Sequence, residues 1–100
     1  MVYQLTSKFP NIEIFGLSSQ LQRAAISISS NLAEGTARNS QKEKARFTEI
    51  SYGSLMEVLS QLILSYDLGY ISNEQLSETR KIIEEIGNKL NRLRQSQLKT

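Results

Sequence analysis

The side chains of this chain that can do chemistry are carboxylates, amines, guanidinium groups, amides and hydroxyls, because the sequence contains neither histidine nor cysteine. The chain therefore lacks the usual general base at neutral pH, the commonest metal ligand and a thiolate nucleophile. The polar residues that remain form no phosphate-binding loop, no metal-ligand spacing and no pair of nucleophile and base. The sequence predicts a protein that is not an enzyme, binds no metal or cofactor and has no evident small-molecule substrate.

One group of polar residues has the spacing of a site. Glu34 and Arg38 are four positions apart, so they can pair if a helix persists that far. Asn31 lies one turn earlier on the same face, and Arg46 is a candidate to face them. Either these residues form a polar binding site or they form a structural network that fixes a turn, and we favour the structural network.

Positive charge is concentrated in two short segments, although the net charge is only +2. Residues 38–46 carry four bases and one acid, and residues 89–100 carry four bases and no acid. A basic patch of this kind binds phosphates in a salt-sensitive and largely sequence-independent way. The predicted nucleic-acid-binding residues are Arg38, Lys42, Lys44, Arg46, Lys89, Arg92 and Arg94. The alternative is a solvated basic surface.

The elements that must position these residues are helices. Apolar periodicity predicts four of them, over about 2–9, 19–35, 41–68 and 73–95, in a single domain that spans residues 1–100. Start signals are a serine cap at Ser18 or Ser19 and the capping-box sequences Ser40–Glu43 and Ser72–Gln75. Gly35 and Gly69 are the expected stops.

Short loops between helices make them antiparallel neighbours, so the predicted fold is an all-α, antiparallel, up-and-down four-helix bundle with a truncated first helix. Chain direction then brings the start of the third helix beside the end of the fourth, and the two basic segments meet at one end of the bundle. Bases in the last turn of a helix suit its dipole, but bases in the first turns of the third helix oppose it, which indicates a partner.

Pairing the residues of the second and third helices outward from the turn near Arg38 predicts that Gly53 and Ser54 face Ala24 and Ala25. Small residues on both sides would let the two helices approach closely. The same register places Glu57 within about a turn of Arg23, so an ion pair between these two side chains is expected. The third helix is expected to bury a stripe that includes Ile50 and Tyr66.

A short first helix leaves part of the apolar surface uncovered, and exposed apolar patches usually become interfaces. Self-association is therefore expected through the residues that fall off the main stripes: Ile26, Leu59, Ile63 and Ile82.

Three separated segments carry a family resemblance, namely SISSNLAEGTARNS, RFTEISYGSLMEVLSQL and YDLGYIS. In these segments and across nearly the whole chain, the sequence resembles the four-helix bundle family of bacterial 23S rRNA intervening sequence proteins. The residues that match the family pattern are Asn31, Ala33, Glu34, Gly35, Arg38, Gly53, Ser54, Leu55, Glu57 and Asp67 to Tyr70. Departures are the short first helix, Lys44 and Thr48 where apolar or aromatic residues are common, and Leu59 where an acid is usual.

The resemblance implies a homo-oligomer, with a ring of five copies as the expected assembly. It also implies kinship to the accessory bundles of diversity-generating retroelements, which assist a reverse transcriptase and bind nucleic acid. We therefore expect an oligomer that binds RNA, DNA or a nucleoprotein through its basic end; the alternative is a protein-binding scaffold without nucleic-acid affinity. With no apolar run near the roughly 18 residues of a membrane span and no signal-peptide pattern, the expected location is cytoplasmic, away from membranes.

Overall fold

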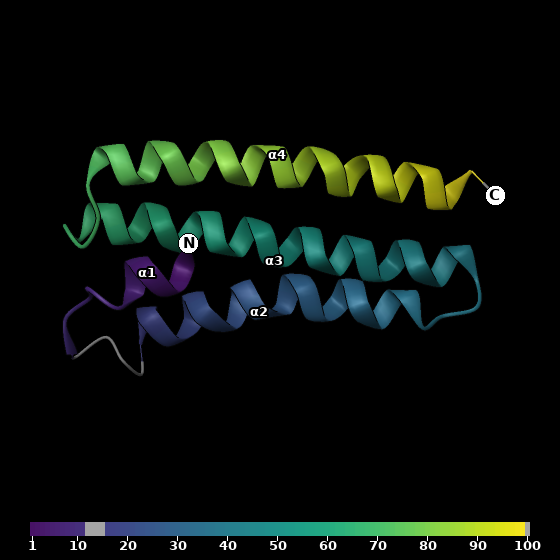
Figure 1. Cartoon of the computed structure of the whole chain (residues 1–100), viewed down its shortest axis with the longest axis horizontal. Helices are drawn as coiled ribbons and strands as arrows, with labels where there is room; N and C mark the ends of the chain where they lie inside the picture. The colour runs from purple at the N-terminus through teal and green to yellow at the C-terminus, as the bar shows by residue number, and fades with distance from the viewer. Residues whose placement is uncertain (12–15, 100) are drawn as a thin grey trace.

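The computed structural model of the chain describes residues 1–11 and 16–99, and every regular element in these residues is a helix. The helices are α1 (Val2–Thr6), α2 (Leu17–Thr36), α3 (Gln41–Asp67) and α4 (Asn73–Leu98). They run alternately up and down, with the N-terminus partway along the bundle and the C-terminus at one end (Figure 1). The prediction of an antiparallel helical bundle with a short first helix is confirmed.

Several helix ends differ from the prediction. α1 ends at Thr6 rather than at residue 9, and α4 continues to Leu98 rather than ending near residue 95. α2 begins at Leu17 with Gly16 as its N-cap, so the helix start is not capped by a serine. These differences are small because fraying and local turns make helix ends the least determined part of any helix.

The two glycines expected to stop helices behave differently. Gly69 has a φ of 80° and follows α3, so it is a helix stop in the left-handed region, as predicted. Gly35 lies inside α2, which continues to Thr36. A Cβ built on Gly35 would lie 3.0 Å from the Cβ of Phe47 on α3. The prediction that Gly35 stops the helix is therefore wrong; this glycine lets α2 and α3 approach each other.

The two predicted capping boxes are formed to different extents. Ser72 accepts a hydrogen bond from the Gln75 amide (3.1 Å), and its own amide donates to the Gln75 side chain (2.8 Å). At the start of α3, Ser40 accepts from the Glu43 amide (3.1 Å), and this is the half of the box that forms. The first turn of α4 is therefore fixed by two side-chain bonds and that of α3 by one.

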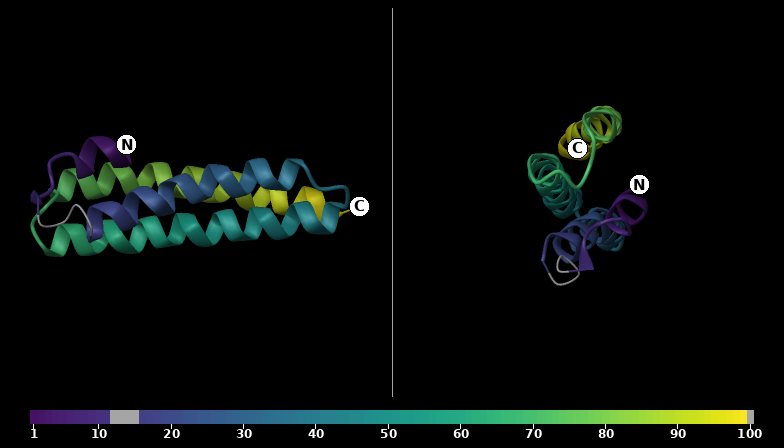
Figure 2. Two further views of the ribbon diagram at one scale, coloured as in Figure 1. Left: turned by 90° about the horizontal axis from the view of Figure 1, so that it is seen from below. Right: turned by 90° about the vertical axis from the view of Figure 1, so that its left-hand side faces the viewer.

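The long helix α3 is the centre of the molecule. It packs against α2 on one side and α4 on another, whereas the backbones of α2 and α4 stay apart from each other within the described residues. The end-on view in Figure 2 shows α3 at the apex of a V whose arms are α2 and α4. Its fully buried side chains meet those of both neighbours in one apolar core: Leu21, Leu55, Val58, Leu62 and Ile83.

Hydroxyl groups set the register between α2 and α3. Ser27 and Ser54 share a hydrogen bond of 2.8 Å, and the Ser51 hydroxyl donates to the Ile28 carbonyl (2.9 Å). Ser54 thus lies about one turn along α2 from the predicted Ala24 and Ala25. Gly53 is exposed, with no atom within 4 Å of a Cβ built on it. The predicted contact of Gly53 is wrong because neighbouring helical residues point about 100° apart. Only Ser54 of the two can face α2.

The ion pair expected between Glu57 and Arg23 is also not formed. Glu57 instead accepts a hydrogen bond from the Gln61 side chain (3.3 Å), and Gln61 also donates to Gln20 on α2 (3.4 Å). Gln61 is buried between these partners, whereas Glu57 and Arg23 both lie in solvent. Two solvated charges gain little by holding one geometry, because the Coulomb energy is small in water.

Burial of the apolar residues follows the prediction in part. Ile26 and Ile82 are exposed, as expected from their positions off the main stripes. Leu59 and Ile63 are instead partly buried against the core, because the contact with α4 widens the buried face of α3. Ile50 and Tyr66, predicted to be buried, are exposed.

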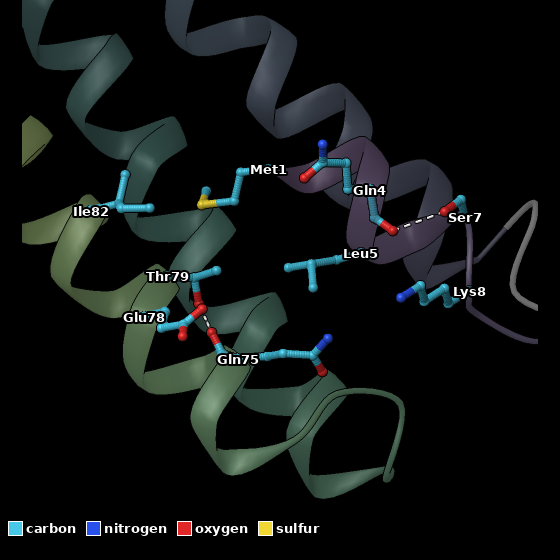
Figure 3. Close-up of a pocket in the computed structure, with 9 residues that line it drawn as sticks. All are labelled: Met1, Gln4, Leu5, Ser7, Lys8, Gln75, Glu78, Thr79 and Ile82. Carbon is cyan, nitrogen blue, oxygen red and sulfur yellow. Dashed lines mark hydrogen bonds between the residues drawn. The ribbon is translucent and has the colours of Figure 1, made fainter.

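The short α1 covers only one end of the cleft between α2 and α4. It packs on α2, where the Gln22 side chain donates to the Thr6 hydroxyl (2.9 Å). A cavity of about 640 Å³ separates it from α4, with Met1 and Leu5 facing Thr79 and Ile82 (Figure 3). A second cavity of about 590 Å³, with Leu32 and Leu93 among its lining residues, lies at the other end of the cleft.

Candidate nucleic-acid interface

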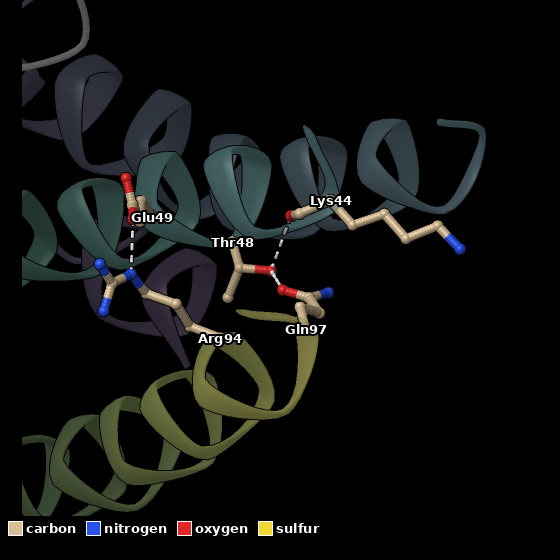
Figure 4. A network of polar contacts seen from close by, with 5 residues as sticks. All are labelled: Lys44, Thr48, Glu49, Arg94 and Gln97. Carbon is tan, nitrogen blue, oxygen red and sulfur yellow. Dashed lines mark hydrogen bonds and ion pairs between the residues drawn. The ribbon is translucent and has the colours of Figure 1, made fainter. Parts of the chain in front are cut away.

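The start of α3 lies beside the end of α4, as chain direction predicts. Arg94 forms an ion pair with Glu49 at 2.5 Å, and the Thr48 hydroxyl donates to the Gln97 side chain at 2.8 Å (Figure 4). Thr48 is almost fully buried, and its hydroxyl also lies 3.1 Å from the Lys44 carbonyl. These contacts fix the two basic segments side by side. We call this part of the surface, where residues 38–46 meet residues 92–99, the basic end.

Three of the predicted phosphate-binding residues surround one cavity. Lys42 and Arg46 on α3 and Arg94 on α4 line a surface cavity of about 610 Å³. Glu43 and Glu49 line it as well, so three bases face two acids. Since Glu49 is bound to Arg94, Lys42 and Arg46 are the bases of this cavity without an ion pair.

The other predicted residues lie outside this cavity. Lys44 lines the cavity at the open end of the cleft, and Figure 4 shows its side chain extending away from Thr48 and Gln97. Arg92 and Lys89 are exposed on α4, two and five residues before Arg94. Two residues before Lys89, Gly87 packs against Tyr52 and Leu55 of α3. Lys89 is therefore level with the middle of α3, so the prediction that it lies at the basic end is wrong.

Arg38 belongs to the turn between α2 and α3. Its guanidinium pairs with Glu34 at 2.9 Å and lies over the Phe47 ring at 4.8 Å from the centroid. The predicted pairing of Glu34 with Arg38 is confirmed, although the helix ends two residues before the arginine. An exposed ion pair contributes at most about 1 kcal/mol. The cation–π contact connects the turn to α3 and supports a structural role for Arg38.

Asn31 belongs to a different network from Glu34 and Arg38. Its side-chain amide donates to the Ser27 carbonyl (2.9 Å) and lies 3.0 Å from the Ser27 hydroxyl, which contacts Ser54. The suggested single polar site of Asn31, Glu34 and Arg38 is thus divided into two structural networks. Neither Ser27 nor Gln97 is among the residues that the sequence analysis singled out. For Ser27, the available signal was its hydroxyl group, which lies one helical turn before Asn31.

The described residues offer little for a metal ion. Over residues 1–11 and 16–99, no three acidic side chains are grouped so that they could bind one together. In the same residues, no helix is both long and apolar enough to cross a lipid bilayer. The cytoplasmic location stays a prediction.

The described helices define the class of this protein as a small antiparallel helical bundle with a short first helix. Residues 1–92 match the model of the family described as 23S rRNA-intervening sequence protein. Because the match covers more than nine tenths of the chain, the protein belongs to this family, and the resemblance noted in the sequence is confirmed. A search of curated proteins finds no match to the chain.

Proposed function

We propose that this protein is a homo-oligomer that binds nucleic acid, as free RNA or DNA or within a nucleoprotein, through its basic end. The observation that carries the proposal is the cavity between α3 and α4 in which Lys42, Arg46 and Arg94 come together from distant parts of the sequence. Backbone phosphates are recognised by clusters of this type. The family name refers to 23S rRNA and is compatible with an RNA-related role.

The helix dipole strengthens this argument. Lys42, Lys44 and Arg46 lie in the first two turns of α3, where backbone amides already supply positive potential. Placing bases there is unfavourable for the isolated helix. A negatively charged partner that binds this end would gain from both the side chains and the helix terminus.

Self-association is supported by exposed apolar side chains on more than one face, among them Ile26 on α2, Leu64 on α3 and Ile82 on α4. The family resemblance implies a ring of five copies. An oligomer would also repeat the basic end and raise the affinity for a long nucleic acid, because linked sites bind with a high effective concentration.

The test is a salt titration of binding to random-sequence single-stranded RNA and DNA. The logarithm of the affinity should fall linearly with the logarithm of the salt concentration, by roughly 0.7 per phosphate contacted on a single strand. The variant with Lys42→Gln, Lys44→Gln and Arg46→Gln should lower the slope by about 2, which corresponds to three lost contacts. The matched control changes Lys8, Arg23 and Lys81 to glutamine; it removes the same charge elsewhere and should keep most of the slope.

A second candidate function is a protein-binding scaffold without nucleic-acid affinity. It is favoured by the two acids that face the three bases in the same cavity, because mixed charges of this kind suit a protein partner. Absence of binding at low salt, or equal slopes for the basic-end variant and the control, would favour the scaffold.

A further inference from the structure

One acid of the cavity between α3 and α4 occupies a base that a phosphate would also bind. Glu49 accepts a hydrogen bond from Arg94 Nε at 2.5 Å. Both side chains line the cavity of about 610 Å³ to which Lys42 and Arg46 also contribute. A carboxylate and a nucleic-acid phosphate each offer a guanidinium the same partner, an anionic oxygen that accepts its hydrogen bonds. Glu49 and a bound phosphate would therefore compete for one arginine.

The ion pair between Glu49 and Arg94 has the geometry of a weak one. A guanidinium carries five N–H donors, and within the described residues Nε is the Arg94 donor that contacts Glu49 (Figure 4). Bidentate pairs, in which two N–H groups meet two oxygens, are stronger. The two side chains are also 43% and 49% exposed, and exposed ion pairs are weak because water screens the charges. Arg94 can therefore leave Glu49 for a better-placed anion.

The bundle has a second contact that holds α3 beside α4 at this end. The Thr48 hydroxyl, which is almost fully buried, donates to the Gln97 side chain at 2.8 Å. Thr48 directly precedes Glu49, and Gln97 lies about one turn after Arg94. Because this bond joins the same two stretches of helix, the cavity should persist when the ion pair opens.

We infer that Glu49 is an internal competitor for Arg94, which restricts binding at this cavity to ligands with several connected phosphates. The inference rests on the proposed function and adds selectivity to the same site. An isolated phosphate has to displace Glu49 unaided. A nucleic acid that Lys42 and Arg46 already hold presents a further phosphate at high effective concentration, and this phosphate displaces the carboxylate.

The second acid of the cavity provides a matched comparison. Glu43 lines the same cavity as Glu49, but within the described residues it forms no ion pair with a base. Changing either acid to glutamine removes one negative charge from the cavity. The change at Glu49 additionally frees Arg94, so the difference between the two variants reports the competition.

The first experiment measures the affinity of the full chain for random-sequence single-stranded RNA after Glu49→Gln and after Glu43→Gln. Both variants should bind more tightly than the parent chain, because each removes a charge that repels phosphate. Glu49→Gln should exceed Glu43→Gln by about fivefold, the upper range for one exposed ion pair. It should also steepen the salt dependence by up to about 0.7, for one further phosphate contact. Equal gains in the two variants would overturn the inference.

The same pair of variants in an Arg94→Gln background separates competition from simple charge removal. Without the arginine, Glu49→Gln should gain no more than Glu43→Gln, because residues that act through each other are not additive in a double-mutant cycle. If Glu49→Gln kept its full advantage in this background, Glu49 would act on the phosphates directly and the inference would be wrong.

The second experiment follows the Nε–H resonance of Arg94 by NMR at constant ionic strength. In the parent chain, single-stranded RNA should shift this resonance and inorganic phosphate should not; in Glu49→Gln, both should shift it. A resonance that stays in place at saturating RNA, or that responds to inorganic phosphate equally in both proteins, would overturn the inference and leave the proposed function intact. If neither protein binds RNA at low salt, the proposed function fails and the inference with it.

Discussion

At the scale of single residues, two glycines of the bundle have opposite surroundings. Gly35 is buried where α2 crosses α3, and Gly53 faces open space on the outer side of α3. Both match the family pattern, and the sequence alone suggested a helix stop for one and a packing contact for the other. The short distance from Gly35 to the Phe47 Cβ shows instead that the close approach occurs at Gly35.

The paired substitutions Gly35→Ala and Gly53→Ala should therefore change stability in opposite directions. Alanine at residue 35 places a methyl group 3.0 Å from the Phe47 Cβ, which is fixed to the backbone and has no rotamer that relieves the clash. We expect a loss of about 1–3 kcal/mol in the free energy of unfolding, measured by urea denaturation. Alanine at residue 53 meets nothing and should stabilise the folded monomer by up to about 1 kcal/mol. A gain at residue 35 would show that the helices separate without cost.

At the scale of helices, the capping boxes at the starts of α3 and α4 form different numbers of hydrogen bonds, although their sequence patterns are alike. Ser40–Glu43 and Ser72–Gln75 have the same capping-box spacing, but both bonds of the box form only at Ser72. The Gln75 side chain satisfies a backbone amide that the helix itself leaves without a partner.

Truncation at the third position of each helix should reveal this difference. Gln75→Ala removes the bond to the Ser72 amide and should lower the free energy of unfolding by about 1 kcal/mol. Glu43→Ala removes no hydrogen bond and should cost a few tenths of a kcal/mol, through the helix dipole alone. Thermal denaturation of the two variants at one pH and salt concentration makes the comparison. Equal losses would mean that the box at Ser40 closes in solution.

Sequence patterns predicted the helices better than their relative rotation. Apolar periodicity and the caps at Ser40 and Ser72 fix where α3 and α4 begin. The rotation of α3 was misjudged because serine, alanine and glycine look equally small in a sequence, although a hydroxyl such as that of Ser51 selects one position by its bond to Ile28. Chain direction alone predicted that the two basic segments meet at one end of the bundle. The position of Lys89 and the pairing of Arg94 with Glu49 depend on the relative rotation and register of α3 and α4, and they were not predicted.

At the scale of the whole molecule, the number of neighbours differs strongly between helices. Within the described residues, the backbone of α3 lies close to two helices, whereas that of α1, which has five residues, lies close to α2 alone. Short helices depend on tertiary contacts for their stability. The anchors of α1 include buried Val2, Leu5 packed against the core, the bond between Thr6 and Gln22, and the packing of Phe9, just after the helix, on Tyr70 at 5.2 Å between ring centroids.

Native-state hydrogen exchange should therefore separate α1 from the rest. The amides of Leu5 and Thr6 should exchange through local opening, at a free energy well below that of global unfolding, whereas amides near Leu55 and Leu62 should exchange only through global unfolding. Dilute denaturant should leave the α1 rates unchanged and accelerate those of central α3. Equal protection of α1 and α3 would mean that the bundle opens as a single unit.

The V-shaped arrangement around α3 also bears on how the chain acquires its structure. Since the backbones of α2 and α4 stay apart within the described residues, the close helix–helix approaches there join elements that follow each other in the sequence. Such local topology is associated with rapid folding, in microseconds to milliseconds. Either hairpin, α2–α3 or α3–α4, can form without the third long helix. The chain therefore has two independent starting points on one shared helix. A nascent chain leaving the ribosome would complete the α2–α3 hairpin first and then add α4 to a surface that is already in place.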